Sequence, residues 1–136
     1  MPLISRTLDL EYESIVCRDA FNIFTPSDTE AVNKYGGYNI SYPRLANIGG
    51  EWDPWRPATP LAFGYGAVPR ESTIDEPFIL IPKAVHHWDE NGLFPNQTTA
   101  SLPPKTIVNT QKAEHEFVLE WMEEWKQYCA IVGGCS

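Results

Sequence analysis

The stretch Leu45-Ala-Asn-Ile-Gly-Gly-Glu-Trp-Asp-Pro-Trp55 passes from an apolar run through two glycines into an acidic loop. We expect residues 45–48 to form a short buried strand. Because Pro54, Pro57 and Pro60 follow, residues 51–60 can be neither a long helix nor a central strand. The sequence therefore predicts a strand that ends in a loop carrying an aspartate.

A second apolar run, Phe78-Ile-Leu-Ile81, is also followed by a polar loop. It is short, β-prone and closed by Pro82, which is typical of a strand buried on both faces in a parallel sheet. The loop after it contains His86 and His87. Because parallel strands place their carboxyl ends at one edge, we expect Asp53 to meet one of these histidines there.

An aspartate beside a histidine is the acid and base pair of a catalytic triad. The carboxylate fixes the histidine tautomer and leaves the other ring nitrogen free to take a proton from a nucleophile. In α/β-hydrolases the chain order is serine, acid, histidine, and Asp53 precedes the histidines here. A zinc site built from His86, His87 and Asp89 is an alternative. It is not favoured, because adjacent histidines point to different sides of the backbone, so we predict no metal and no cofactor.

The C-terminal part predicts a long amphipathic helix. Residues 92–104 contain Gly92 and three prolines and form an irregular excursion. Beyond them the residues expected on one face of the helix recur at spacings of three and four, with charged residues largely opposite. The members of this expected face are Val108, Glu114, Phe117, Val118, Trp121, Met122 and Trp125.

The N-terminal part is expected to be helical. Apolar residues at helical spacing predict one helix over residues 8–24. Ser27 or Asp28 can cap a second, short helix that runs to Asn33 and stops before Gly36-Gly37. The fold class is therefore α/β: two parallel strands, irregular loops and a long C-terminal helix. Two strands do not make a stable sheet alone, so we expect an incomplete domain.

Composition narrows the function classes. The chain has 136 residues, 43% of them hydrophobic, and a net charge of -8, which repels nucleic acid and anionic membranes. No apolar run approaches the roughly 20 residues of a membrane span. Residues 1–6 lack the features of a signal peptide. We therefore expect no nucleic acid partner and no membrane association.

Other features indicate a secreted protein. Asn39-Ile-Ser41 and Asn96-Gln-Thr98 are glycosylation sequons. The chain has three cysteines, so one bridge at most closes within it. Cys129 and Cys135 flank a Gly-Gly turn and can pair. Cys17 is left either to pair with sequence outside this chain or to remain a buried free thiol.

Two motifs give the chain a family resemblance. Gly49-Gly-Glu-Trp-Asp-Pro-Trp55 is similar to the Gly-x-x-Asp-Pro-Trp acid motif of the S28 serine peptidases. Ala84-Val-His-His-Trp-Asp89 is similar to their small-x-His-(His or Cys)-x-Asp motif. Residues 12–126 resemble fungal members, which are acid prolyl endopeptidases or extracellular serine carboxypeptidases. Lysosomal Pro-X carboxypeptidases and dipeptidyl-peptidases are further relatives.

The resemblance implies an α/β-hydrolase domain with a helical cap, cleavage after proline without a metal or cofactor, and a location outside the cell or in lysosomes or vacuoles. Asp53 would be the triad acid and His86 the base. Trp55, and less directly Trp88, would border the pocket for the substrate proline. Residues 1–43 would end the cap, residues 44–128 would carry both motifs, and residues 129–136 would form a Cys/Gly tail.

The chain departs from the family at the nucleophile. None of its seven serines has a glycine two positions before and two positions after it, as the nucleophile elbow requires. We therefore expect a fragment that is inactive alone, that associates with a missing N-terminal part, and whose parent enzyme takes proline-containing peptides. The alternatives are a non-catalytic remnant or binding module, and a small metal- or sugar-binding protein.

Overall fold

The computed structural model describes residues 7–135, and the chain divides into two compact units, Met1–Asn33 and Lys34–Ser136. The division falls after Asn33. Tyr38 belongs to the second unit, where its hydroxyl donates a hydrogen bond of 2.6 Å to the carbonyl of Pro57. The boundary after residue 43, between the end of the cap and the hydrolase domain, stays a prediction.

The first unit contains two helices, α1 (Leu10–Phe21) and α2 (Thr29–Asn33). The side chain of Asp9 caps α1 by accepting a hydrogen bond from the N–H of Tyr12 at 2.9 Å. Asp28, and not Ser27, caps α2 by accepting from the N–H of Ala31 at 2.8 Å. Both expected helices are thus present, and α1 buries none of its residues.

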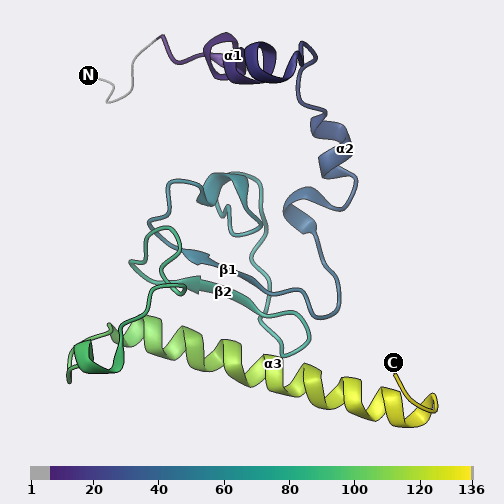
Figure 1. Ribbon diagram of the computed structural model, residues 1–136, viewed down its shortest axis with the longest axis vertical. Helices are drawn as coiled ribbons and strands as arrows, with labels where there is room; N and C mark the ends of the chain where they lie inside the picture. The colour runs from purple at the N-terminus through teal and green to yellow at the C-terminus, as the bar shows by residue number, and fades with distance from the viewer. Residues whose placement is uncertain (1–6, 136) are drawn as a thin grey trace. The chain divides into compact units, whose positions relative to one another are not determined.

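The second unit is built on a parallel pair of strands, β1 (Asn47–Gly50) and β2 (Phe78–Ile81), as the sequence predicted. The two strands lie side by side in Figure 1. In their register, Asn47 is opposite Phe78 and Gly50 is opposite Ile81. β1 starts two residues later than expected. Its first ladder bond runs from the N–H of Asn47 to the carbonyl of Pro77, because Leu45 still belongs to a turn in which its N–H bonds to Tyr42.

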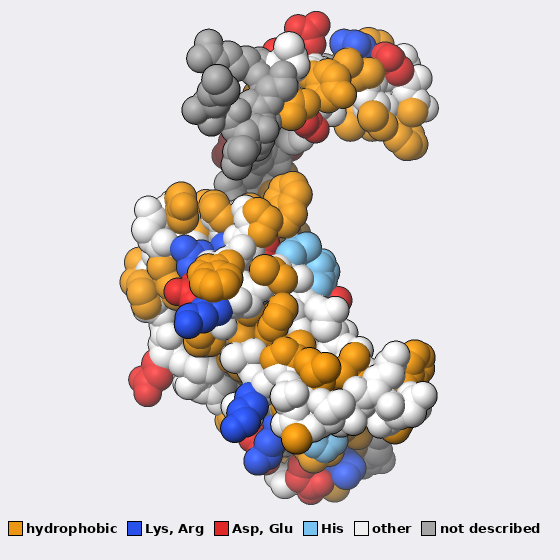
Figure 2. Space-filling view, turned by 90° about the vertical axis from the view of Figure 1, so that its left-hand side faces the viewer, with side chains coloured by type: hydrophobic (Ala, Val, Ile, Leu, Met, Phe, Trp, Pro, Cys, Tyr) orange, Lys and Arg blue, Asp and Glu red, His pale blue; other side chains and the backbone are white. Residues whose placement is uncertain are grey.

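β2 is less buried than expected. Ile81 is 2% exposed, but the three residues before it are only half-buried, so the prediction of a strand buried on both faces is wrong for this chain. Within the described residues β2 has one neighbouring strand, β1, and its other edge is unpaired. Figure 2 shows orange apolar side chains at several places on the visible face, among white and charged groups.

The expected C-terminal helix is present as α3, which spans Lys105–Ile131 and passes on the β2 side of the sheet (Figure 1). Its inward face differs from the predicted one. The buried residues are Ile107, Thr110 and Phe117, whereas Val118, Met122 and Trp125 are exposed. No helix among residues 7–135 combines the length and apolar character that crossing a membrane requires.

Hydrogen bonds between α3 and other segments explain which face of the helix is turned inward. Near the start of the helix, the hydroxyl of Thr106 accepts a hydrogen bond from the indole of Trp88 at 2.9 Å. Further along, the indole of Trp121 donates to the carbonyl of Ile74 at 2.8 Å. Because these attachments lie on one side of the helix, they hold Phe117 inward and leave the neighbouring apolar stripe outside.

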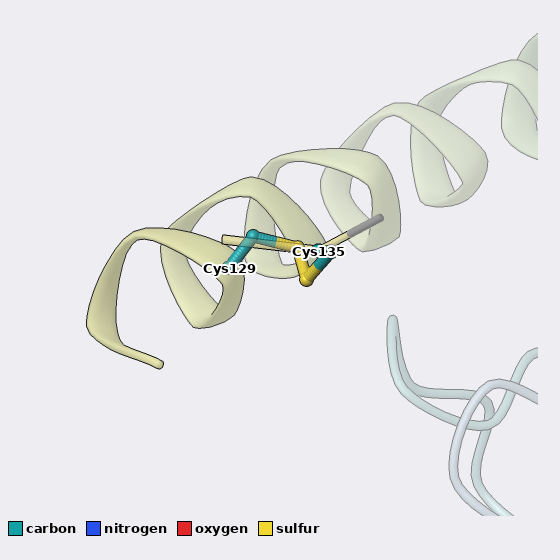
Figure 3. Close-up of a disulfide and its surroundings, with 2 residues drawn as sticks. All are labelled: Cys129 and Cys135. Carbon is teal, nitrogen blue, oxygen red and sulfur yellow. A yellow bond between two sulfur atoms is a disulfide. The ribbon is translucent and has the colours of Figure 1, made fainter. Parts of the chain in front are cut away.

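A disulfide closes the end of the chain. Cys129 and Cys135 are bonded, with their Cα atoms 5.2 Å apart (Figure 3). Cys129 lies in the last turn of α3, so the helix extends into the segment that the sequence suggested was a tail. Cys17 is a free thiol and is exposed, so it is not the buried thiol that one of the two alternatives required.

Candidate active site

Backbone bonds hold the loops after β1 and β2 side by side. The N–H of Glu51 donates to the carbonyl of Ile81 at 3.0 Å, and the N–H of Trp52 donates to the carbonyl of Ala84 at 2.8 Å. The carboxylate of Glu51 also accepts from the N–H of Lys83 at 2.8 Å. Gly50 permits this approach, because a Cβ there would lie 2.4 Å from the carbonyl oxygen of Ala84.

The loops bring Asp53 and His86 together. Nδ1 of His86 lies 2.9 Å from Oδ2 of Asp53, and the other carboxylate oxygen accepts from the N–H of Trp55 at 2.8 Å. The Asp53 side chain is 9% exposed and that of His86 is 47% exposed. Among residues 7–135, Nε2 of His86 has no hydrogen-bond partner. We call these two residues the Asp53–His86 pair.

The surroundings keep Asp53 ionised. Burial by itself raises the pKa of the carboxyl. The hydrogen bonds from His86 and from the backbone of Trp55 act in the opposite direction, as does the positive charge of the two histidines. Together they outweigh burial and lower the pKa of Asp53 below its ordinary value, so the carboxylate is available to orient the imidazole.

The neighbouring His87 is directed elsewhere. Its Nδ1 lies 2.7 Å from Oε1 of Glu90, and the bond and charge of Glu90 raise the pKa of His87. The backbone of His87 is left-handed, with φ at 55°, and its ring meets that of His86 edge to face at 3.9 Å between centroids. Of the two histidines that the sequence offered, His86 is the one bonded to Asp53.

A hollow of about 180 Å³ adjoins the Asp53–His86 pair and is bordered by both loops. Trp55 lines this hollow, and its role at a pocket for the substrate proline stays a prediction. Trp88 does not line the hollow, since its half-buried indole is bonded to Thr106 of α3. The lining residues are Ile48, Gly49, Gly50, Asp53, Trp55, Arg56, Thr59, Leu61, His86, His87, Asp89 and Glu90.

Neither serine nor cysteine occurs among these lining residues. The one hydroxyl there belongs to Thr59, which donates to the carbonyl of Arg56 at 2.9 Å and accepts from the N–H of Leu61 at 3.2 Å. Within residues 7–135, no serine hydroxyl is hydrogen-bonded to His86. The described residues thus bring a carboxylate and an imidazole together without a serine hydroxyl bonded to them.

The acidic residues of the second loop do not form a metal site. No group of three or more His, Cys, Asp or Glu residues in the described part of the chain is arranged to hold a metal ion. Glu90 pairs with His87. The pKa of Glu114 on α3 is raised, mainly because its carboxyl group is partly buried. The negative charge of Asp89 and a hydrogen bond with Asp89 raise it as well.

Both sequon asparagines, Asn39 and Asn96, are exposed and lie in short 3-10 turns. They differ in the third residue of the sequon. The hydroxyl of Ser41 donates to the carboxylate of Glu76 at 2.7 Å, whereas that of Thr98 makes only a long contact of 3.4 Å with the carbonyl of Phe94. Glycosylation at either site stays a prediction.

Sequence reasoning missed three residues of this region. Glu51 binds the backbone of the second loop, Glu90 takes His87 away from Asp53, and Arg56 lines the hollow. Arg56 directly follows the quoted acid motif in the sequence and could have been considered. The roles of Glu51 and Glu90 depend on contacts that spacing does not reveal.

An Asp–His pair at the carboxyl edge of a parallel sheet is an arrangement that serves acid–base chemistry in hydrolases. No family model matches the chain. It is 52% identical over 122 residues, 90% of its length, to a protein of Arthroderma benhamiae described as a "Probable extracellular serine carboxypeptidase". The chain covers 17% of that relative. It is therefore similar, over most of its length, to a segment of a serine carboxypeptidase.

Proposed function

We propose that this chain supplies the acid and the base of a Ser-His-Asp triad to a serine peptidase that cleaves after proline. The observation that carries the proposal is the 2.9 Å contact between Nδ1 of His86 and Oδ2 of Asp53. Similarity to a segment of a serine carboxypeptidase supports it independently. The Gly-x-x-Asp-Pro-Trp and small-x-His motifs favour the S28 type.

In this mechanism His86 acts first as a general base and then as a general acid. Asp53 holds the imidazole in the tautomer that leaves Nε2 free, and it stabilises the positive charge that forms on the ring. The nucleophilic serine comes from polypeptide outside the described residues. Its attack on the carbonyl after proline gives an acyl-enzyme, which water then hydrolyses.

Trp55 is the proposed wall for the substrate proline. It lines the hollow next to Asp53, and its side chain is largely exposed, so its aromatic face is available to a flat, apolar ring. Trp88 is the weaker candidate because its indole is bonded to α3.

An extracellular location fits the relative's description, the Cys129–Cys135 disulfide and the exposed sequon asparagines. A lysosomal or vacuolar location is the alternative that the wider family offers. Glycosylation is tested by secreting the chain behind a signal peptide and treating it with a glycosidase. We expect the treatment to shift its electrophoretic mobility, and loss of this shift in Asn39→Gln or Asn96→Gln identifies the glycosylated asparagine.

A chimera tests the catalytic proposal. The matching 17% of the Arthroderma benhamiae relative is replaced by this chain, and hydrolysis of a proline-containing peptide is measured at acid pH. We expect the chimera to be active and His86→Ala to lower kcat by roughly 10³- to 10⁶-fold. His115→Ala, which alters an exposed histidine of α3, is the matched control and should keep full activity.

Undiminished turnover by the His86→Ala chimera would exclude His86 as the base. An inactive wild-type chimera beside an active relative would favour a non-catalytic binding module. Fluorophosphonate labelling of the chain alone adds a direct check: we expect none, and a labelled serine would show that the nucleophile lies within the chain.

A further inference from the structure

Arg56 is a half-buried cation beside the Asp53–His86 pair, and no group among residues 7–135 neutralises it. It begins the 3-10 turn Arg56–Ala58 and lines the same hollow as Asp53, Trp55 and His86. Its guanidinium makes no hydrogen bond, ion pair or aromatic contact within these residues. An unpaired guanidinium that borders a hollow is available to bind an anionic ligand.

The other described arginines all have carboxylate partners. Arg18 pairs with Asp19 at 3.1 Å, and Arg44 pairs with Glu124. Arg70 lies 3.7 Å from Glu76 and also covers the ring of Phe78. The chain has 18 acidic residues against 10 basic ones, so carboxylates are in excess. Arg56 is therefore not left unpaired by a shortage of acids.

We propose that Arg56 binds a carboxylate of the peptide substrate, namely the free α-carboxylate at its C-terminus. This inference rests on the proposed peptidase function and adds a residue that decides specificity. A guanidinium is suited to the task, because its planar N–H groups bind both oxygens of a carboxylate at once. Placed near the catalytic residues, such a group would let the enzyme recognise the C-terminal end of a peptide.

Local structure fixes Arg56 relative to the catalytic pair. Its N–H donates to the carbonyl of Asp53 at 3.1 Å, so the cation and the catalytic carboxylate belong to one turn. The second loop contributes His87, Asp89 and Glu90 to the same lining, where Glu90 is paired with His87. Since His86 is likewise paired with Asp53, Arg56 is the basic side chain of this lining that has no carboxylate partner.

Arg56 also borders a second hollow of about 280 Å³, whose lining includes Glu51, Trp52 and Tyr65. Glu51 forms no ion pair with Arg56, and its carboxylate accepts from the N–H of Lys83. A ligand carboxylate can reach Arg56 as the C-terminus of a peptide or as an acidic side chain within it. The experiment separates these two sources.

The test follows the Nε–Hε signal of Arg56 in the full chain with nitrogen-15-labelled arginine. Three probes are added: acetyl-Ala-Pro-Phe as free acid, its C-terminal amide, and acetyl-Ala-Pro-Glu amide, whose single carboxylate is in the side chain. We expect the free acid to shift the signal and its amide to leave it unchanged. A shift by the Glu peptide amide alone would overturn the assignment to the C-terminal carboxylate.

Kinetics of the chimera give a second measurement. Arg56→Gln should raise KM for the free-acid peptide roughly ten- to hundredfold, with a smaller change in kcat and no change for the amide. Arg56→Lys should restore part of the affinity. Lys83→Gln, which removes an exposed cation at the start of the second loop, is the matched control.

Equal effects of Arg56→Gln on the free acid and the amide would overturn the inference, because a structural defect lowers activity on both. The inference would also be overturned if the free-acid peptide left the Arg56 signal unchanged and Arg56→Gln left KM for that peptide unchanged. The proposed triad is judged separately, by the loss of kcat in the His86→Ala chimera with the amide substrate. Either proposal can therefore fail while the other stands.

Discussion

At the scale of single residues, the ionisation of Asp53 reports the contact with His86. Two opposing effects act on the pKa of this carboxyl group. Burial raises it, and the hydrogen bonds and positive charge around the group lower it by more, so the net pKa lies below its ordinary value. A lowered pKa in the folded state stabilises the fold above the ordinary pKa of about 4. That contribution is lost as the pH falls through the lowered pKa of Asp53.

We predict that His86→Ala raises the pKa of Asp53, because the substitution removes a hydrogen bond and a charge and leaves burial in place. Carbon-13 NMR of the Asp53 carboxyl, followed through the acid range, measures the change. His115→Ala should leave this titration unchanged. An Asp53 pKa that is the same in His86→Ala and in the wild type would mean that the pair does not form in solution.

At the scale of elements, the approach of the two loops depends on Gly50. A methyl group at this position would meet the Ala84 carbonyl at 2.4 Å, which neither β1 nor the second loop can accommodate without moving. We predict that Gly50→Ala lowers the free energy of unfolding by about 1–3 kcal/mol, as measured by urea denaturation.

Gly92→Ala is the matched control, because no atom lies within 4 Å of the position that its Cβ would occupy. It should be neutral or stabilising by up to about 1 kcal/mol, since it restricts only the unfolded chain. Equal urea midpoints for Gly50→Ala and the wild type would contradict the crowding argument.

The sequence was informative where local chemistry decides the structure. Proline positions delimited the loops, and the apolar run Phe78–Ile81 located β2. The rule that parallel strands end at one edge placed Asp53 beside the two histidines, and the family resemblance favoured His86. The inward face of α3 could not be predicted from periodicity. Two hydrogen bonds between distant parts of the chain orient the helix: Trp88 donates to Thr106, and Trp121 donates to the carbonyl of Ile74. The free guanidinium of Arg56 was equally invisible, since spacing does not show which acids are already paired.

At the scale of the whole molecule, the second unit leaves a large apolar stripe on α3. Val118, Met122 and Trp125 are exposed and, with Trp121 and Lys126, line an open hollow of about 290 Å³. Apolar side chains also reach the surface at several places on the face seen in Figure 2. Contiguous apolar surface of this kind favours association over a dispersed monomer.

The net charge of -8 opposes association between copies, and salt screens that repulsion. We therefore predict that the 136-residue chain self-associates as its concentration rises, and that added salt strengthens the association. Met122→Gln should weaken it, because the substitution replaces an exposed apolar side chain while keeping a good helix former.

Sedimentation velocity over a concentration series measures this effect. Glu120→Gln, at an exposed position outside the stripe lining, is the control and should not reduce association. A wild-type chain that sediments as a monomer at every concentration, with or without added salt, would show that the stripe does not drive self-association. Association that weakens with salt would instead indicate charge pairing between copies, because screening reduces ionic attraction and leaves apolar burial intact.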